Sequence, residues 1–230
     1  MRYRHIFFDL DHTLWDADAN SVEALRELYQ KYALHEMGLV SLDRFIEKYD
    51  EINKKFWADY SKGKISKQSL RYKRFLLVLQ HFGIKNYDLS YSLSEDYVEI
   101  APHKSIVQPF THEILNYLGT RYSLHIITNG FEDAQYSKLK ASKIESHFKQ
   151  VITPEQAGHK KPSPLIFEYA LKQVKAMASD CIMIGDDLEV DILGARAAGI
   201  DQVYYNLKGK QHAETVNYEI KSLNELMEIL

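Results

Sequence analysis

Acidic residues follow two short apolar runs of the chain. Asp9 and Asp11 come directly after one run, Asp186 and Asp187 come after another, and Asp191 lies shortly beyond. So many carboxylates gathered at one place would repel one another unless a cation neutralised them. Ligand sets made of oxygen atoms alone select Mg²⁺ or a similar hard ion. The pattern therefore predicts a magnesium site, provided that the fold brings the acids together.

The same acids also have ordinary structural explanations. An Asp-X-Asp pair at the end of a strand often caps the following helix or bends a loop, and short motifs carry a real risk of false matches. One of Asp186, Asp187 and Asp191 is also expected to cap the helix that follows them. Alone, the pair Asp9 and Asp11 decides nothing, and its meaning depends on the residues placed with it.

Groups that could bind an anion lie further along the chain. Thr128-Asn129-Gly130 stands where an apolar run gives way to a helical pattern, and backbone N–H groups at the start of a helix attract anions. Lys161 precedes Pro162, which holds the lysine extended before another helix. Taken separately, the segment Thr128-Asn129-Gly130 can be an ordinary turn, and Lys161 can be a solvated surface lysine. Lys160 is an alternative to Lys161 as the lysine of the site. With the acids, they describe a site for phosphoryl transfer.

The elements that would position these residues alternate in type. We expect strands at about 5–10, 124–128, 151–153, 181–184 and 203–206. We expect helices at about 109–119, 132–141, 164–175 and 188–198, with a last helix from about 222. Strands that alternate with helices form a parallel sheet, and open parallel sheets bind ligands beyond the carboxyl ends of their strands. The fold class is therefore α/β, with the candidate residues at one edge of the sheet.

Residues 16–101 interrupt this alternation with helices alone. They contain no proline and few glycines, and their apolar residues recur at three- and four-residue spacing. We expect helices at about 18–36, 42–60, 66–82 and 88–100, with Ser41 at the start of the second. Because the first strand must pair with the later ones, we expect a core from residues 1–15 plus 102–230 and an inserted all-helical domain from 16–101.

Composition limits what the protein can be. Its 230 residues are 45% hydrophobic and 27% charged, as in ordinary globular proteins, and no apolar stretch approaches 18 residues. The net charge of −3 argues against binding to a nucleic acid polymer. A single cysteine, Cys181, and an N-terminus without signal-peptide features favour a cytoplasmic location. We expect a monomer or a weak homodimer that binds a small-molecule phosphate ester and no membrane.

The candidate residues resemble the four motifs of the haloacid dehalogenase superfamily, most of whose members are Mg²⁺-dependent phosphohydrolases. In chain order the motifs read Asp9-Leu10-Asp11-His12-Thr13, Thr128-Asn129-Gly130, Lys161-Pro162 and Gly185-Asp186-Asp187 with Asp191. One departure is His12, where many members carry glycine, and it bears on the shape of the loop rather than on the chemistry. The resemblance implies a Rossmann-like core sheet with a helical cap of the first type inserted after the first motif.

The same resemblance implies the catalytic roles. Asp9 would be the nucleophile that forms an aspartyl-phosphate. Asp11 would be the general acid for the leaving alcohol and then the base for water. Asp11 would need a proton at the start, and a neighbouring anion would favour that protonated form.

The remaining motif residues would bind the metal and the phosphate. The resemblance implies that Mg²⁺ would be held by Asp9, the backbone carbonyl of Asp11 and Asp186. The phosphoryl oxygens would be bound by Thr128, Asn129 and Lys161. Metal-bound waters or the lysine would be held by Asp187 or Asp191.

Further stretches resemble a bacterial branch of the superfamily that acts on pyrimidine nucleoside 5'-monophosphates. They are residues 53–60, Gly130-Phe131 and Asp191-Ile192-Leu193-Gly194. Asn53, Trp57 and Tyr60 would share one face of a cap helix, which makes them candidates to bind the substrate, with a nucleobase stacked on Trp57. Aromatic residues at helical spacing are more often core residues, and packing within the cap is the interpretation that we favour.

Four other functions use similar residues. A dehalogenase of the same fold needs neither a metal nor a second acid, so Asp11 and Asp186 argue against it. A sugar phosphomutase or a phosphoglycolate phosphatase would use the same four motifs and would differ mainly in the cap. A phosphorylated receiver domain also combines acids, a threonine and a lysine at strand ends. Such a switch is shorter, lacks a large insertion after its first strand, and has no aspartate two residues beyond the phosphorylated one.

Overall fold

The structure, a computed structural model, describes residues 2–39 and 41–230. They form two units. The core unit comprises the residues up to Ala17 together with Ser105–Leu230, and the helical unit comprises Asp18–Lys104. The helical unit begins two residues later and ends three residues later than the expected range 16–101.

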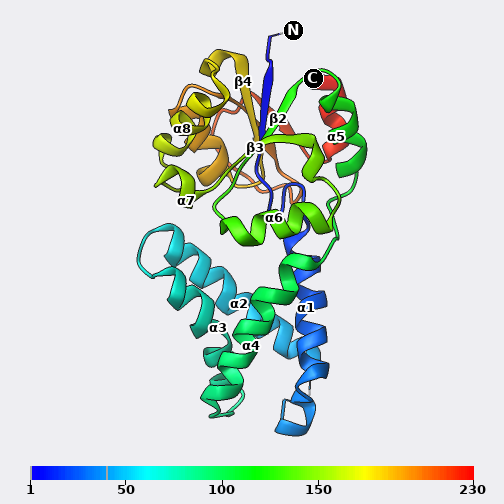
Figure 1. The fold of residues 1–230 in the computed structure, drawn as a ribbon, viewed down its shortest axis with the longest axis vertical. Coiled ribbons are helices and arrows are strands. Elements are labelled where there is room, and N and C mark those ends of the chain that lie inside the picture. Colours follow the sequence, from blue (N-terminus) through cyan, green and yellow to red (C-terminus); the bar gives the residue numbers. More distant parts are fainter. Residues whose placement is uncertain (1, 40) are drawn as a thin grey trace. The chain divides into compact units, whose positions relative to one another are not determined.

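The core unit contains a six-stranded sheet with the strand order β3-β2-β1-β4-β5-β6 (Figure 1). The strands are β1 (His5–Phe8), β2 (Ser123–Ile127), β3 (Phe148–Ile152), β4 (Cys181–Gly185), β5 (Asp201–Tyr205) and β6 (Tyr218–Ile220). All neighbouring strands run parallel, and β1 pairs with both β2 and β4. This confirms the α/β fold class. The sequence did not predict β6, because it is short and has no apolar run.

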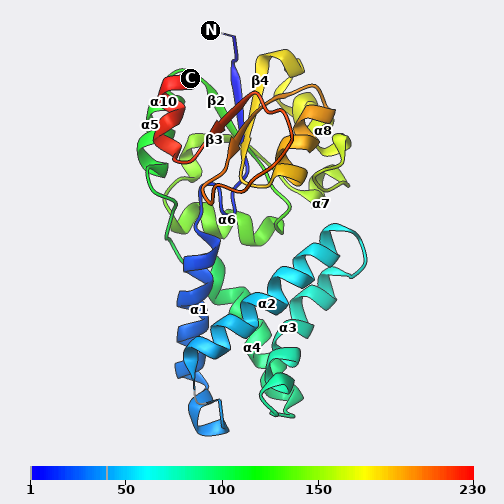
Figure 2. The same ribbon diagram turned by 180° about the vertical axis from the view of Figure 1, so that it is seen from behind.

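Helices cover both faces of this sheet (Figure 2). Ile6 and Phe8 of β1 pack in one buried cluster, to which α5 (Thr111–Gly119) and α10 (Leu226–Ile229) also contribute. Phe7 points to the opposite face and packs in a second cluster with α8 (Pro164–Val174). Successive side chains of a strand alternate between faces, so burial on both sides requires an unbroken apolar run. Such runs are why β1 and β4 could be located from sequence, whereas β2 contains the buried His125.

The segment after β4 differs from the expected single helix at 188–198. It forms a π-helical turn, Leu188–Leu193, followed by the short helix α9 (Gly194–Ala197). The backbone amides of Asp191 and Ile192 both donate to the carbonyl of Asp187, at 2.9 and 3.3 Å. Such turns are rare and are often found at functional sites, so a periodic apolar pattern does not reveal them.

Helices α6 (Glu132–Ala141) and α7 (Pro154–Ala157) follow β2 and β3, and a third helix comes last in the core unit. This last helix is α10, which follows the 3₁₀ turn Leu223–Glu225. That turn and α10 together occupy the helix expected from about 222. No helix in the described part of the chain combines the length and the apolar character needed to cross a membrane.

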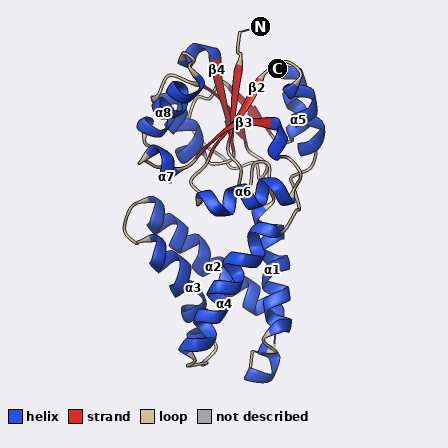
Figure 3. Ribbon diagram, in the orientation of Figure 1, coloured by secondary structure: helices blue, strands red, loops and turns tan. Residues whose placement is uncertain are grey.

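The described part of the helical unit contains helices and turns without a strand (Figure 3). Its helices are α1 (Ala17–Lys31), α2 (Leu42–Ser61), α3 (Lys67–His81) and α4 (Tyr87–Ile100). The side chains of Ser41, Ser66 and Asn86 each accept a hydrogen bond from the amide three residues later. These N-caps fix the starts of α2, α3 and α4, and the predicted start at Ser41 is confirmed.

The first helix is shorter than the expected 18–36. It ends at Lys31, and a separate 3₁₀ turn, Leu34–Met37, follows. Between them Ala33 adopts a left-handed conformation with φ 46°, which no α-helix can contain. This break lets Leu34 point into the unit, where it is fully buried.

The two segments that lead into and out of the helical unit pair with each other inside the core unit. The amide of Asp16 donates to the carbonyl of Ile106 at 3.1 Å, and the amide of Gln108 donates to the carbonyl of Leu14 at 2.8 Å. Trp15 and Val107 form an antiparallel bridge between these bonds. We call the paired segments 14–16 and 106–108 the neck.

Candidate active site

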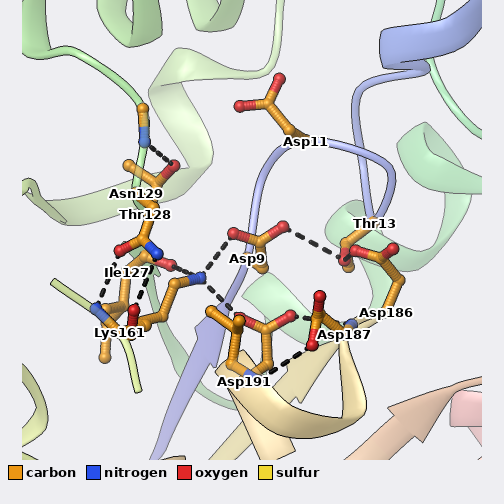
Figure 4. Close-up of polar contacts among 12 residues, drawn as sticks. Asp9, Asp11, Thr13, Ile127, Thr128, Asn129, Lys161, Asp186, Asp187 and Asp191 are labelled. Carbon is orange, nitrogen blue, oxygen red and sulfur yellow. Dashed lines mark hydrogen bonds and ion pairs between the residues drawn. The ribbon is translucent and has the colours of Figure 1, made fainter. Parts of the chain in front are cut away.

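The candidate residues of the core unit gather at the carboxyl ends of three adjacent strands (Figure 4). Asp9 directly follows β1 in the centre, with Thr128 after β2 on one side and Asp186 after β4 on the other. Lys161 reaches in from the loop before α8, and Asp191 from the π-helical turn. The parallel topology therefore assembles residues that are up to 182 positions apart in the sequence, from Asp9 to Asp191.

The ammonium group of Lys161 binds two of the carboxylates. Its Nζ donates to Asp9 Oδ1 and to Asp191 Oδ1, both at 2.6 Å, and to the Ile127 carbonyl at 2.7 Å. These contacts use all three hydrogens of the ammonium group. Lys161 is only 1% exposed, whereas Lys160 lies partly exposed beside it. Of the two lysines that the sequence left open, Lys161 contacts Asp9 and Asp191.

The acids carry more negative charge than this one lysine balances. Burial raises the pKa of Asp9 well above its usual value, and although Lys161 opposes this, the charges of Asp191 and Asp186 add to it. Burial and the charge of Asp191 also raise the pKa of Asp186, to about 7. Burial alone would lower the pKa of Lys161, but Asp191 and Asp9 outweigh it and raise that pKa above its usual value. The lysine therefore stays charged while its neighbours favour protonation.

These carboxylates fit a hard divalent cation. Oxygen atoms of Asp9, Asp186 and Asp191 lie within 4.8 Å of one another. The fully buried hydroxyl of Thr13 is shared between Asp186 Oδ1 at 3.2 Å and Asp9 Oδ2 at 3.5 Å. Mg²⁺ prefers oxygen ligands, and its charge would stabilise the ionised form of these carboxyl groups, whose pKa values are raised. Two of the expected ligands, Asp9 and Asp186, belong to this set, and the side chain of Asp11 does not.

Asp191 can approach the other acids because residue 185 is a glycine. A Cβ atom at Gly185 would lie far inside van der Waals contact with a carboxylate oxygen of Asp191. Asp191 Oδ2 accepts the amide of Asp187 at 3.1 Å. Asp187 itself caps the π-helical turn, since its Oδ1 accepts the amides of Glu189 and Val190 at 3.0 and 2.9 Å. Asp191 thus contacts the lysine, and Asp187 shapes the backbone.

Asp11 is the residue whose surroundings differ most from expectation. Its carboxylate points away from Asp9 (Figure 4), and it accepts Lys138 Nζ on Oδ1 at 2.6 Å and Gln135 Nε2 on Oδ2 at 2.9 Å. Burial raises the pKa of Asp11, but the charge of Lys138 and the hydrogen bonds from both residues outweigh it, so this pKa is lowered. The expectation that a neighbouring anion keeps a proton on Asp11 is wrong in this arrangement, because a cation lies against it.

The turn after β2 holds its side chains in two different ways. Thr128 Oγ1 accepts the amide of Gly130 at 3.1 Å and Gln135 Nε2 at 2.6 Å. The amide group of Asn129 pairs with the backbone of Lys161, donating to its carbonyl at 2.9 Å and accepting its N–H at 2.8 Å. Asn129 therefore ties the two loops together, and its contact with a phosphoryl group stays a prediction.

Three residues of this site were not identified as site residues from the sequence. Thr13 stands inside the first motif, so the motif itself was a signal for it. Gln135 and Lys138 lie three residues apart on α6, the helix that follows Thr128. An amide and a lysine on a helix are usually surface residues, so their spacing alone gave no reason to select them.

The three cap candidates lie on α2 in the helical unit. Asn53 Oδ1 accepts the guanidinium of Arg74 at 2.6 Å. The rings of Trp57 and Tyr60 meet edge to face with their centroids 5.8 Å apart, and Tyr60 is buried. This contact joins two residues one turn apart on α2, and the favoured packing in the core of the cap stays a prediction. A contact of any of the three with substrate stays a prediction.

Comparisons with known proteins agree with this geometry. Residues 6–205 match the family described as haloacid dehalogenase-like hydrolase. Over its full length the chain is 34% identical to the pyrimidine 5'-nucleotidase PynA of Streptococcus pneumoniae, covering 96% of it. It is 28% identical over its full length to the pyrimidine 5'-nucleotidase YjjG of Escherichia coli, covering 99%. A crystal structure of the putative HAD-hydrolase YfnB of Bacillus subtilis, bound to magnesium, matches with a TM-score of 0.88 at 27% identity, covering 100% of this chain and 99% of that one.

A parallel sheet with carboxylates, a hydroxyl and a buried lysine at its carboxyl edge is typical of α/β proteins that bind a ligand at that edge. Within that class, the chain belongs to the haloacid dehalogenase-like hydrolases. The family that the four motifs predicted is thereby confirmed, as is the expectation of an enzyme rather than a receiver-type switch.

Proposed function

We propose that the protein is a Mg²⁺-dependent phosphomonoesterase that hydrolyses small phosphate esters, in the first place pyrimidine nucleoside 5'-monophosphates. The chemistry rests on the buried Asp9, held between Lys161 and Thr13 at the centre of the site. The substrate class is supported by the full-length likeness to two pyrimidine 5'-nucleotidases. A cytoplasmic location and a monomeric or weakly dimeric state stay predictions.

In the proposed reaction Asp9 is the nucleophile. One of its carboxylate oxygens forms a bond to phosphorus while the bond from phosphorus to the ester oxygen breaks, which leaves an aspartyl-phosphate. Asp11 passes a proton to the departing alcohol oxygen. Because Lys138 holds Asp11 ionised in this arrangement, that proton has to be taken up when the substrate binds. Asp11 then takes a proton from water, whose oxygen attacks phosphorus as the bond to Asp9 breaks and inorganic phosphate is released.

The other residues bind and orient the phosphoryl group. The turn at Thr128 offers a hydroxyl near the start of α6, where the helix dipole favours an anion. Lys161 keeps Asp9 in place and offsets part of the negative charge. When bound, Mg²⁺ would be held by Asp9, Asp186 and the backbone carbonyl of Asp11, and it would stabilise the negative charge of the phosphoryl oxygens.

A substrate panel tests the proposed specificity. We expect UMP, dUMP and CMP to show a kcat/KM at least about tenfold above those of AMP and GMP, as a pocket fitted to the smaller base would give. Phosphate release is measured with Mg²⁺ for these nucleotides, for sugar phosphates and for phosphoglycolate. The 3'-monophosphate of uridine is the matched control, because it differs from UMP only in the position of the phosphate.

The panel also decides between members of the family. If phosphoglycolate or a sugar phosphate is the best substrate, the nucleotidase assignment is wrong and the phosphatase assignment survives. If no ester releases phosphate with Mg²⁺, the phosphomonoesterase proposal fails. A chelator should stop turnover, and added Mg²⁺ should restore it.

The raised pKa of Asp186 predicts how pH changes the protein. In the metal-free state this pKa is about 7 against an ordinary value of 3.8, so the folded protein keeps a proton that the unfolded chain loses. The stability from this group is fully present below about pH 4 and is lost as pH rises to about 7. Because Mg²⁺ competes with that proton, its affinity should fall as pH drops below about 7, by up to about tenfold per unit.

Thermal unfolding with EDTA and with Mg²⁺, across pH 5 to 8.5, measures both effects. Asp186→Asn is the control, because it removes the titrating group and keeps a side chain of similar size. The difference in stability between wild type and this variant should change between pH 5 and pH 8 in EDTA. A constant difference, or Mg²⁺ stabilisation that is independent of pH, would contradict the assignment of this pKa to Asp186.

A further inference from the structure

Gln135 joins two parts of the site that the reaction uses separately. Its side chain is fully buried, and its single amide nitrogen donates to Asp11 Oδ2 at 2.9 Å and to Thr128 Oγ1 at 2.6 Å. An amide nitrogen carries two hydrogens, so one is available for each bond. Gln135 therefore links the predicted acid–base group to the predicted phosphate-binding hydroxyl.

The contacts of Thr128 determine where its own proton points. A threonine hydroxyl has one hydrogen and two acceptor lone pairs. Both lone pairs of Thr128 Oγ1 are used, one by the amide of Gly130 at 3.1 Å and one by Gln135. In both of these bonds the hydroxyl is the acceptor, so its hydrogen remains to be donated. Without Gln135, the Thr128 hydroxyl could rotate and donate that hydrogen to another acceptor.

The orientation of the Gln135 amide is itself fixed. Turning the amide over would place its oxygen against the Asp11 carboxylate, which has acceptors only, so the two groups would repel. A Cβ atom at residue 130 would overlap Gln135 Cδ, so Gly130 provides the space that the amide fills. The unpartnered Oε1 is the cost of this orientation, since it is buried without a hydrogen bond.

Lys138 completes the arrangement one turn further along α6. It donates to the second oxygen of Asp11, and its Nζ lies 4.6 Å from the centre of the Trp15 ring, in the neck. Both carboxylate oxygens of Asp11 therefore accept hydrogen bonds from α6, one from Gln135 and one from Lys138. Of these two residues, only Gln135 also donates to Thr128. This difference singles out Gln135 as the residue that serves both groups.

We propose that Gln135 is a positioning residue for the reaction, which turns the Thr128 hydroxyl outward as a donor to the phosphoryl group and holds one oxygen of Asp11. The inference rests on the proposed function, because it takes the phosphoryl group to be bound at Thr128. It adds a residue that touches neither substrate nor metal and that acts through two others.

Gln135→Met tests the proposal, because methionine has nearly the same length and shape and donates no hydrogen bond. We expect the Kd for inorganic phosphate, measured by titration calorimetry with Mg²⁺, to rise about tenfold when the Thr128 hydroxyl is no longer oriented. The kcat should fall by a larger factor than KM rises, because Asp11 is released as well. Wild-type phosphate affinity in this variant would overturn the proposal.

A double-mutant cycle with Thr128→Val separates positioning from general damage. If Gln135 acts on phosphate through Thr128, adding Gln135→Met to Thr128→Val should weaken phosphate binding no further. Effects that multiply would overturn the proposal. Gln202→Met is the matched control, since it removes another buried amide, on β5, and should leave phosphate affinity unchanged. Wild type that binds no phosphate and hydrolyses no ester would instead refute the proposed function.

Discussion

Asp9→Asn is expected to lower kcat for a pyrimidine nucleoside monophosphate by at least about 10⁴-fold, with the fold intact. The asparagine amide is no nucleophile, so the bond to phosphorus does not form. The folded state tolerates the change, because the oxygen of the new amide would still accept the Lys161 ammonium and one of the buried, mutually repelling charges disappears. Steady-state kinetics and the melting temperature measure the two parts of this expectation.

Asp180→Asn is the control for that experiment. Asp180 precedes β4 at the opposite end of the sheet, where it pairs with the exposed Arg4 at 2.8 Å. An exposed ion pair of this kind contributes little to stability, so the variant should resemble wild type in kcat and in melting temperature. Turnover retained in Asp9→Asn would rule out the covalent route through Asp9. Loss of the fold in that variant would show that Asp9 is needed for structure.

Lys161→Met is expected to reduce the free energy of unfolding by about 3–5 kcal/mol at pH 8. The substitution leaves the buried carboxylates of Asp9 and Asp191 without their common cation and the Ile127 carbonyl without its donor. The loss should shrink at pH 5, because burial has already raised the pKa of both carboxyl groups and protonation removes their charge. Urea denaturation in EDTA at the two pH values measures it.

Two further variants test whether the loss of stability in Lys161→Met comes from the buried charges. Lys160→Met removes the neighbouring, partly exposed lysine and should cost no more than about 1 kcal/mol. Adding Asp191→Asn to Lys161→Met should recover part of the loss, since one of the two abandoned charges is gone. If Lys161→Met were as stable as wild type at pH 8, the three residues would not form the buried group described above.

The residues at the strand ends were predictable because two independent constraints coincide there. A strand buried on both faces must be apolar, as β1 and β4 are, so the polar residues that follow stand out in the sequence. The parallel topology then requires Asp9, Thr128 and Asp186 to meet at one edge. Neither constraint involves side-chain conformation, which is why the sequence was sufficient for this part of the site.

The parts that were missed depend on side-chain direction and on local backbone geometry. Gln135 and Lys138 belong to the site because α6 turns that face toward Asp11, and no composition or spacing rule reveals this. Their presence reverses the expected protonation of Asp11. His12, by contrast, could be singled out from the sequence, because many members of the family carry glycine there. Its φ of 65° lies in the left-handed region that favours glycine.

The neck makes the sheet independent of what is inserted into it. Its hydrogen bonds join segments 14–16 and 106–108 within the core unit, so the start and the end of the insertion are fixed to each other. The entropic cost of closing a loop rises only slowly with the length of the loop, and the hydrogen bonds of the neck already close the loop that contains the helical unit. An insertion of another size or shape could therefore replace the helical unit without opening the sheet. In evolution, the helical unit can therefore change while the residues at the strand ends are kept.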